Sequence, residues 1–167
     1  MKRRKAKAFG YEVKEWLAAR TRFGKKLKWS CEHRLAQTGR DYVDVVGRFD
    51  SQTFPRVLIE IELHREDPVS NVVKIWKWAE DNSVARTIFF HAFSHLYSGS
   101  KSERKRRAIF LGKMLTKETK VVYVPLSLRY SPRPKGIYGA GRRTKAARSL
   151  ARRITNRLAK SGFLPHP

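Results

Sequence analysis

Two segments of alternating polar and apolar residues lie close together in the chain, and they constrain the fold more than any other feature. DYVDVVGRF (41–49) and RVLIEIEL (56–63) both have the period of a β-strand, and only the polar loop DSQTFP separates them. Such a short connection predicts an antiparallel hairpin, in which the apolar faces of the two strands coincide. Asp44 then shares the other face with Glu60 and Glu62. We therefore expect three carboxylates to converge on one side of the hairpin.

The rest of the chain alternates between helical and strand-like patterns. Helical spacing predicts helices over 11–23, 70–82, 102–118 and 144–160, and strand patterns cover 27–35, 85–93 and 120–128. In the helix over 70–82 we expect Trp76 to pack in the core and Trp78 to be less constrained. The helix over 144–160 has an apolar stripe of Ala147, Leu150, Ile154 and Leu158. This order of elements predicts an α/β fold in which helices cover a mixed sheet.

A chain of 167 residues is most simply one domain. We expect a basic N-terminal arm over 1–10, a core domain over 11–128, and a basic C-terminal extension over 129–167 that consists of a loop and a helix. The single cysteine, Cys31, excludes an internal disulfide. No apolar run approaches the roughly 18 residues of a transmembrane helix, so no membrane partner is expected.

The charge of the chain is strongly positive and unevenly distributed. The formal net charge is +24, from 38 Lys and Arg against 14 Asp and Glu. Residues 1–82 hold 18 basic and 12 acidic residues, whereas residues 83–167 hold 20 basic and 2 acidic ones, so the net charge is +6 in the first half and +18 in the second. Such a surface predicts a polyanionic partner, nucleic acid first of all. Ribosomal proteins share this composition, so charge alone does not choose a function.

The predicted acidic face needs an explanation, because like charges across a strand pair are destabilising. One explanation is that the face is solvated and that Asp44, Glu60 and Glu62 are ordinary surface charges. Acids are scarce in this chain, however, and the helix predicted over 70–82 directly follows the hairpin. A divalent cation would remove the repulsion, because Mg²⁺ binds one or two carboxylates together with water and substrate phosphates. The pattern therefore indicates metal-assisted cleavage of nucleic acid.

This pattern resembles the PD-(D/E)XK nuclease superfamily, the restriction-endonuclease-like fold. The core of that family also runs α–β–β–β–α–β, and its hairpin presents Asp and then Glu-x-Lys. Asp44 matches the first acid, Glu60 the second and Ile61 the intervening residue, and the order of elements matches over about residues 11–93. The lysine position holds Glu62 instead. Some similar proteins use a glutamate there as base or extra ligand, and others place the lysine on the next helix, where Lys74 is the candidate.

The resemblance implies a Mg²⁺ ion, with Mn²⁺ able to substitute for it. Asp44, Glu60 and the carbonyl of Ile61 would hold the metal. Glu62 would position or deprotonate the attacking water, and Lys74 would stabilise negative charge. Family members often add an acid from the first helix, which makes Glu15 or Glu12 a possible outer ligand, and Glu32 on the first strand is a rival.

The basic half of the chain supplies the predicted nucleic-acid contacts. These are Lys101, Arg104, Lys105, Arg106, Arg107, Arg142 and Arg143, which we expect to contact phosphates. His91 and His95 have the i, i+4 spacing of a helical zinc pair. They lie at the end of a predicted strand and lack the glutamate of a zinc protease, so we expect no zinc site there.

Together these features predict a metal-dependent nuclease that hydrolyses phosphodiester bonds, an endonuclease on double-stranded or branched DNA. One alternative is a structure-specific nuclease similar to a Holliday-junction resolvase. A second is a nucleic-acid-binding or ribosome-associated protein without catalysis. A homodimer is plausible, because paired cuts need two active sites. The expected location is cytoplasmic and DNA-associated.

Overall fold

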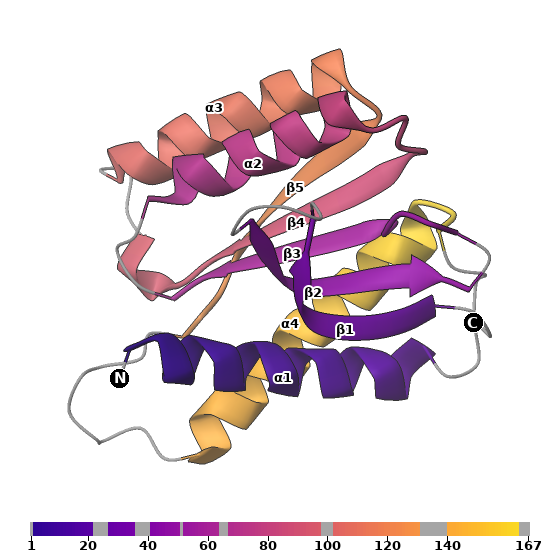
Figure 1. Ribbon diagram of the computed structural model, residues 1–167. Coiled ribbons are helices and arrows are strands. Elements are labelled where there is room, and N and C mark those ends of the chain that lie inside the picture. The colour runs from indigo at the N-terminus through magenta and orange to yellow at the C-terminus, as the bar shows by residue number, and fades with distance from the viewer. Residues whose placement is uncertain are drawn as a thin grey trace.

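The computed structural model describes residues 2–21, 27–35, 41–50, 52–63, 67–97, 102–130 and 140–163. In chain order the elements are α1 (Lys2–Thr21), β1 (Leu27–Arg34), β2 (Tyr42–Phe49), β3 (Val57–Glu62), α2 (Pro68–Asp81), β4 (Thr87–Phe93), the short 3₁₀ helix η2 (His95–Tyr97), α3 (Glu103–Glu118), β5 (Val121–Ser127) and α4 (Ala140–Lys160) (Figure 1). The order predicted from sequence periodicity is confirmed. Within the described residues, no helix is long and apolar enough to cross a membrane.

The strands form one five-stranded mixed sheet in the order β1-β2-β3-β4-β5. The meander β1–β2–β3 is antiparallel, as the short loops require, and β3, β4 and β5 are parallel, with α2 and α3 as their crossover connections. Every residue of β3 and β4 is buried. Strands that are covered on both faces have this property.

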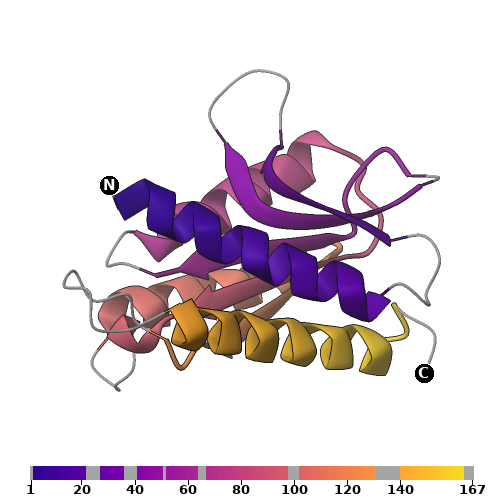
Figure 2. The same ribbon diagram turned by 90° about the horizontal axis from the view of Figure 1, so that it is seen from below.

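Helices cover both faces of the sheet, so the molecule has three layers. α2 and α3 lie on one face, and α1 and α4 lie on the other, where they run side by side (Figures 1 and 2). Each face has its own hydrophobic cluster. The alternation along β3 follows from this arrangement: Ile59, Ile61 and Leu63 point toward α1 and α4, and Leu58 points toward α2 and α3.

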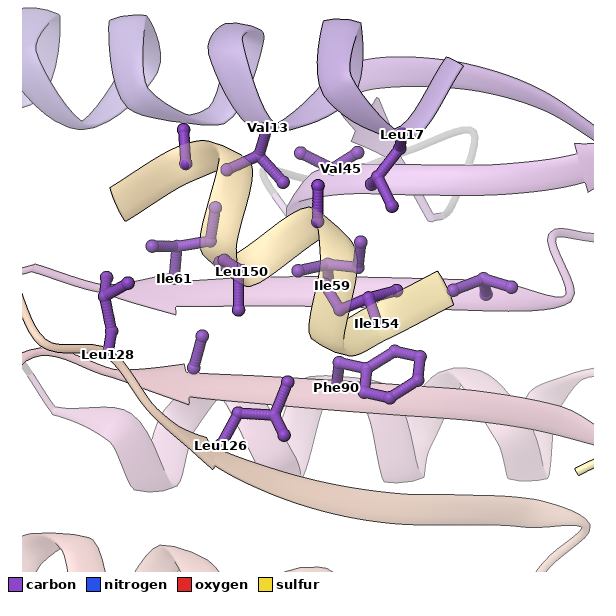
Figure 3. Close-up of a cluster of buried hydrophobic side chains, with 14 of the residues drawn as sticks. Val13, Leu17, Val45, Ile59, Ile61, Phe90, Leu126, Leu128, Leu150 and Ile154 are labelled. Carbon is purple, nitrogen blue, oxygen red and sulfur yellow. The ribbon is translucent and has the colours of Figure 1, made fainter. Parts of the chain in front are cut away.

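The C-terminal helix α4 is part of the same core rather than a separate extension. Its predicted apolar stripe is fully buried, and Leu150 and Ile154 contact the cluster that contains Val13 and Leu17 of α1 (Figure 3). The stripe repeats at helical spacing, so α4 can bury its whole apolar face only against the sheet and α1. The division into a core over 11–128 and an extension over 129–167 therefore does not describe the packing.

Two local expectations differ from the structure. Residues 2–10, expected as an arm, continue helix α1 from Lys2, and Phe9 is completely buried and stacks on Tyr130 at 5.2 Å between ring centroids. In α2 it is Trp78 that is buried, whereas the partly buried Trp76 donates a hydrogen bond from its Nε1 to Glu80 at 2.7 Å. The packing of α2 on the sheet thus lies along Val72, Ile75, Trp78 and Ala79.

Candidate active site

The candidate site begins where β2 separates from β3. The β2–β3 ladder runs only from Gly47↔Val57 to Val45↔Ile59. If that register continued, Ile61 would lie opposite Val43. The amide of Ile61 instead donates a hydrogen bond to Asp44 Oδ2 at 2.8 Å. A carboxylate therefore replaces backbone as the partner of β3, and the hairpin opens at this residue.

Glu60 lies beside Asp44 on the face of the sheet that α2 covers. Its side chain is almost entirely buried, and Lys74 of α2 places Nζ 2.7 Å from Glu60 Oε1. The same ammonium donates a hydrogen bond to the carbonyl of Tyr42 at 2.6 Å. Lys74 therefore joins both strands of the opened hairpin. The helix that presents it begins with Pro68 at its first position, and its N-cap Asp67 accepts a hydrogen bond from Val69 N at 3.1 Å.

Glu62 lies two residues further along β3 and takes part in a different set of hydrogen bonds. Its Oε1 accepts a hydrogen bond from Asn71 Nδ2 at 2.6 Å and lies 2.9 Å from His91 Nε2. The other ring nitrogen of His91, Nδ1, lies 3.0 Å from the hydroxyl of Tyr123. With a neutral ring, Tyr123 donates to Nδ1 and Nε2–H donates to Glu62, which gives each of these buried groups a partner. Asn71, Glu62, His91 and Tyr123 form what we call the buried relay.

The pKa values of these groups reflect their burial. Burial raises the pKa of the Asp44 carboxyl to about 6, opposed by the hydrogen bond from Ile61 and the charge of Lys74. Burial and then the adjacent charge of Asp44 raise the pKa of Glu60 well above its ordinary value, and Lys74 again opposes the shift. Burial lowers the pKa of His91, which favours the neutral ring. Two neighbouring carboxyls that resist ionisation are typical of functional sites.

The donor set at Asp44 and Glu60 fits a hard cation such as Mg²⁺. Glu60 Oε1 is buried, and the Lys74 ammonium 2.7 Å away is its close partner within the described residues. A divalent cation bound between Asp44 and Glu60 would relieve the repulsion between the two carboxylates. The described residues include no cluster of three or more His, Cys, Asp or Glu side chains arranged for a metal. A pair of carboxylates is nevertheless the usual protein contribution to a Mg²⁺ site.

The structure brings together Asp44, Glu60 and Lys74, and it places Glu62 next to them in the buried relay. The alternative acids from α1 lie elsewhere: Glu12 pairs with Arg143 of α4, and Glu15 is exposed and pairs with Lys14. Glu32 of β1 occupies the position that the β1–β2 ladder skips, between the pairs of Cys31 with Val45 and His33 with Val43, and its side chain is exposed. Its φ of 49° is the one positive value at a non-glycine residue of the described chain. A positive φ at a glutamate is a strained backbone conformation.

The predicted basic residues fall into different surroundings. Arg104, Arg106 and Arg107 line a surface pocket of about 780 Å³ together with the exposed Phe110. Lys105 instead lies over the ring of Phe93 at 5.5 Å, and Arg107 also pairs with Glu103. Arg142 lines a larger pocket beside α4, whereas Arg143 is bound to Glu12 at 2.5 Å. Lys101 lies outside the described residues.

The sequence pattern did not predict that His91 contacts Glu62 or that Tyr123 contacts His91. The sequence pattern relates His91 only to His95, at the spacing of a zinc pair. Its relation to Glu62 arises from the parallel register of β3 and β4, which aligns Glu60 with His91. The sequence feature that indicates this contact is His91 itself, which lies within the apolar part of the strand TIFFHAF. A buried polar side chain needs a hydrogen-bond partner.

Comparison of the chain with protein-family models, with curated protein sequences and with solved structures gives no match. The expected resemblance to PD-(D/E)XK nucleases stays a prediction from the motif residues and the element order. Any functional assignment has to be argued from the site itself.

Proposed function

We propose that this protein is a Mg²⁺-dependent nuclease of the PD-(D/E)XK type, with DNA as its substrate. The observation that carries the proposal is the position of Lys74, whose ammonium lies 2.7 Å from Glu60 Oε1. The motif position that would hold lysine holds Glu62, and Lys74 of α2 instead pairs with Glu60 and lowers the pKa of Asp44 through its charge. Two carboxylates and one lysine thus meet at an opened β-hairpin.

Each residue has a chemical role in this proposal. The carboxylates of Asp44 and Glu60, with the carbonyl of Ile61, would hold Mg²⁺, which supplies charge stabilisation at phosphorus and lowers the pKa of a bound water. The ammonium of Lys74 would stabilise the negative charge that develops on the phosphoryl oxygens. Two hydrogen bonds fix Glu62 through its Oε1. We assign Oε2 of Glu62 to accept the proton of the attacking water.

The surface charge supports a nucleic-acid substrate. The pocket with Arg104, Arg106 and Arg107 lies at the N-terminal ends of α2 and α3, because it also includes Asp67 and Val69. β3 runs directly into α2, so this basic surface adjoins the candidate site at the carboxyl end of β3 (Figure 1). Arginine side chains near a carboxylate pair can bind the phosphates of a nucleic-acid backbone and hold it over the carboxylates.

A cleavage assay tests the proposal. Wild-type protein is incubated with supercoiled plasmid, single-stranded DNA and a four-way junction, with Mg²⁺ or with EDTA. We expect cleavage only with the metal, and a loss on the order of 100-fold or more for Asp44→Asn, with DNA binding retained. The matched control is Asp81→Asn, which removes an exposed carboxylate at the end of α2 and should cut like wild type.

The same assay separates the alternatives. Preference for the four-way junction over duplex would assign a resolvase-like specificity. Tight, salt-sensitive binding without cleavage of any substrate would contradict the proposal and favour a nucleic-acid-binding protein without catalysis. Cleavage that persists in Asp44→Asn would also contradict it, since the activity would then come from another site or a contaminant.

A further inference from the structure

A second pocket lies between the carboxyl end of β5 and the first half of α4. Its volume is about 1080 Å³. Residues from three segments line it: His95 of η2, the end of β5 and the residues after it (127–130), and one face of α4. Figure 1 shows the end of β5 descending toward the start of α4 at the edge of the sheet where β3 and β4 also end. We call it the α4 pocket.

The α4 pocket is strongly cationic. Arg129, Arg142, Lys145 and Arg153 line it, and no Asp or Glu is among its described lining residues. On α4, Arg142, Lys145, Ser149 and Arg153 recur at intervals of three or four, so they share one helix face. Arg143, which lies off this face, is the residue that pairs with Glu12. Like charges gathered on one face are destabilising unless an anion binds among them.

The walls of the pocket are held by defined contacts. Arg153 donates a hydrogen bond to the carbonyl of Ser127, which ties α4 to the end of β5. Tyr130 stacks on the buried Phe9 of α1, and its carbonyl accepts a hydrogen bond from His95 N at 3.0 Å. The serines that line the pocket, Ser127 and Ser149, add hydroxyl groups that can donate to phosphate oxygens. These contacts fix the end of β5, the residues after it and α4 relative to one another, so the pocket has a defined shape.

The α4 pocket and the candidate active site lie at the same edge of the sheet. His95 follows Ser94, whose amide donates to the carbonyl of Glu62 at 2.9 Å. The two sites lie on opposite faces, since α2 covers the carboxylates and α4 lines the pocket. The carboxyl edge of parallel strands is where α/β sheets bind ligands. One polyanionic strand that crosses this edge would meet both sites.

We propose that the α4 pocket binds consecutive phosphates of the nucleic-acid strand whose cleavage is proposed above. A pocket of about 1080 Å³ slightly exceeds the usual range of roughly 300–1,000 Å³ for drug-sized ligands, so it is too large for a single phosphate. Four cations match several phosphates better than one. The inference rests on the proposed function for the identity of the strand, and its chemistry, two or more linked phosphates, is shared with free nucleotides and polyphosphates.

The test compares two charge-matched double variants. Arg129→Ala/Lys145→Ala removes two cations from the pocket, and Arg152→Ala/Lys160→Ala removes two exposed cations of α4 that do not line it. Binding to a fluorescent oligonucleotide is followed by anisotropy in EDTA over a salt series. We expect the pocket variant to bind roughly 10-fold or more weakly and to lower the slope of log affinity against log salt by about 2. The control variant should stay close to wild type.

Equal losses in both variants would overturn the inference, because net charge rather than the pocket would then explain binding. Thermal unfolding of both variants checks that they fold, and Lys145→Glu alone serves as a second pocket variant. Tripolyphosphate and ATP serve as competitors. Weak competition by either supports a nucleic-acid strand, whereas ATP that binds more tightly than the oligonucleotide, and only to protein with an intact pocket, identifies a free nucleotide as the source of the phosphates.

The binding assay in EDTA does not depend on cleavage, so the two proposals can fail separately. A protein that never cleaves but shows the selective loss retains the α4 pocket and loses only the nuclease assignment. A protein that cleaves with Mg²⁺ but shows equal losses retains the nuclease assignment and loses the pocket.

Discussion

Asp44 and Glu60 are neighbouring carboxyl groups that the fold holds out of bulk water. Both have raised pKa values, and burial is the largest cause in each case. A carboxyl whose pKa is higher in the folded state than in the unfolded chain destabilises the fold once it ionises. The protein keeps this unfavourable pair beside Lys74, which reduces the cost without removing it. Residues that reduce stability in this way are often kept for function.

The raised pKa of Asp44 predicts how the substitution Asp44→Asn changes the stability of the protein with pH. Below the ordinary pKa near 3.8 the carboxyl is protonated in both states, and above the folded pKa of about 6 it is ionised in both. The free energy of unfolding of wild type should therefore fall as pH rises through this window, relative to the variant. At pH 8, urea denaturation should show Asp44→Asn to be more stable by about 1–3 kcal/mol, because the amide oxygen still accepts the hydrogen bond from Ile61.

The difference should shrink below pH 4, and Mg²⁺ should raise the stability of wild type but not of the variant, because only wild type offers both carboxylates to the metal. A variant that is less stable than wild type at pH 8 would show that the ionised Asp44 contributes favourable interactions larger than its burial cost.

At the residue scale, alternation along the hairpin was enough to predict that Asp44, Glu60 and Glu62 share one face of the sheet. It did not reveal that Asp44 would turn to bond the amide of Ile61, or that Glu62 would bond His91. Both contacts depend on where β2 and β3 separate and on the register of β3 with β4. Such registers are set by packing between segments far apart in the chain, so local periodicity does not contain them.

At the element scale, β3 and α2 match in spacing. Glu60 and Glu62 are two residues apart on a strand, or about 7 Å. Their partners Lys74 and Asn71 are three residues apart on a helix, so they lie on one helix face. One turn of α2 thus contacts both acids: the Lys74 ammonium pairs with Glu60, and the Asn71 amide donates a hydrogen bond to Glu62. The buried relay extends this contact through His91 to Tyr123 of β5.

Packing of α3 on β5 gives a second prediction. A Cβ added at Gly112 of α3 would lie 2.4 Å from ring atoms of Tyr123, whereas one added at Gly141 of α4 would meet nothing within 4 Å. Gly112→Ala should therefore displace Tyr123 and lower the free energy of unfolding by about 1–3 kcal/mol. Gly141→Ala should leave stability unchanged or raise it by up to about 1 kcal/mol.

Urea denaturation of both variants measures the two effects. Equal stability of Gly112→Ala and wild type would mean that α3 can shift away from Tyr123 at little cost, and the close approach at this glycine would then not explain its presence.

Element boundaries show what sequence patterns left out. The predicted helix over 11–23 starts at Lys2 in the structure, and Phe9, one turn before Val13, is buried with it in the core. In α2 the choice between Trp76 and Trp78 depended on how the helix rotates against the sheet. That rotation follows from Val72, Ile75 and Ala79 packing together with Trp78, while Trp76 bonds Glu80 near the surface.

At the scale of the whole molecule, the three-layer arrangement places the candidate active site and the α4 pocket on opposite faces of the sheet. One face of the sheet, under α2 and α3, holds the carboxylates and the buried relay, and the other, under α1 and α4, holds the larger hydrophobic cluster and the α4 pocket. The order of elements and the mixed sheet were predictable, because short loops demand antiparallel neighbours and helical crossovers permit parallel ones. The packing of α4 in the core was not predictable, because its apolar stripe shows that the helix buries one face but does not show which element covers that face.

The central claim is that Lys74 of α2 completes a hydrolytic site with Asp44 and Glu60. The most direct measurement is the single-turnover rate of DNA cleavage with Mg²⁺ for wild type, Lys74→Ala and Lys77→Ala, which removes an exposed lysine from the same helix. We predict that Lys74→Ala cuts on the order of 100-fold more slowly, as loss of a group that stabilises the transition state implies, and that Lys77→Ala cuts like wild type. Equal rates for all three proteins would contradict the account.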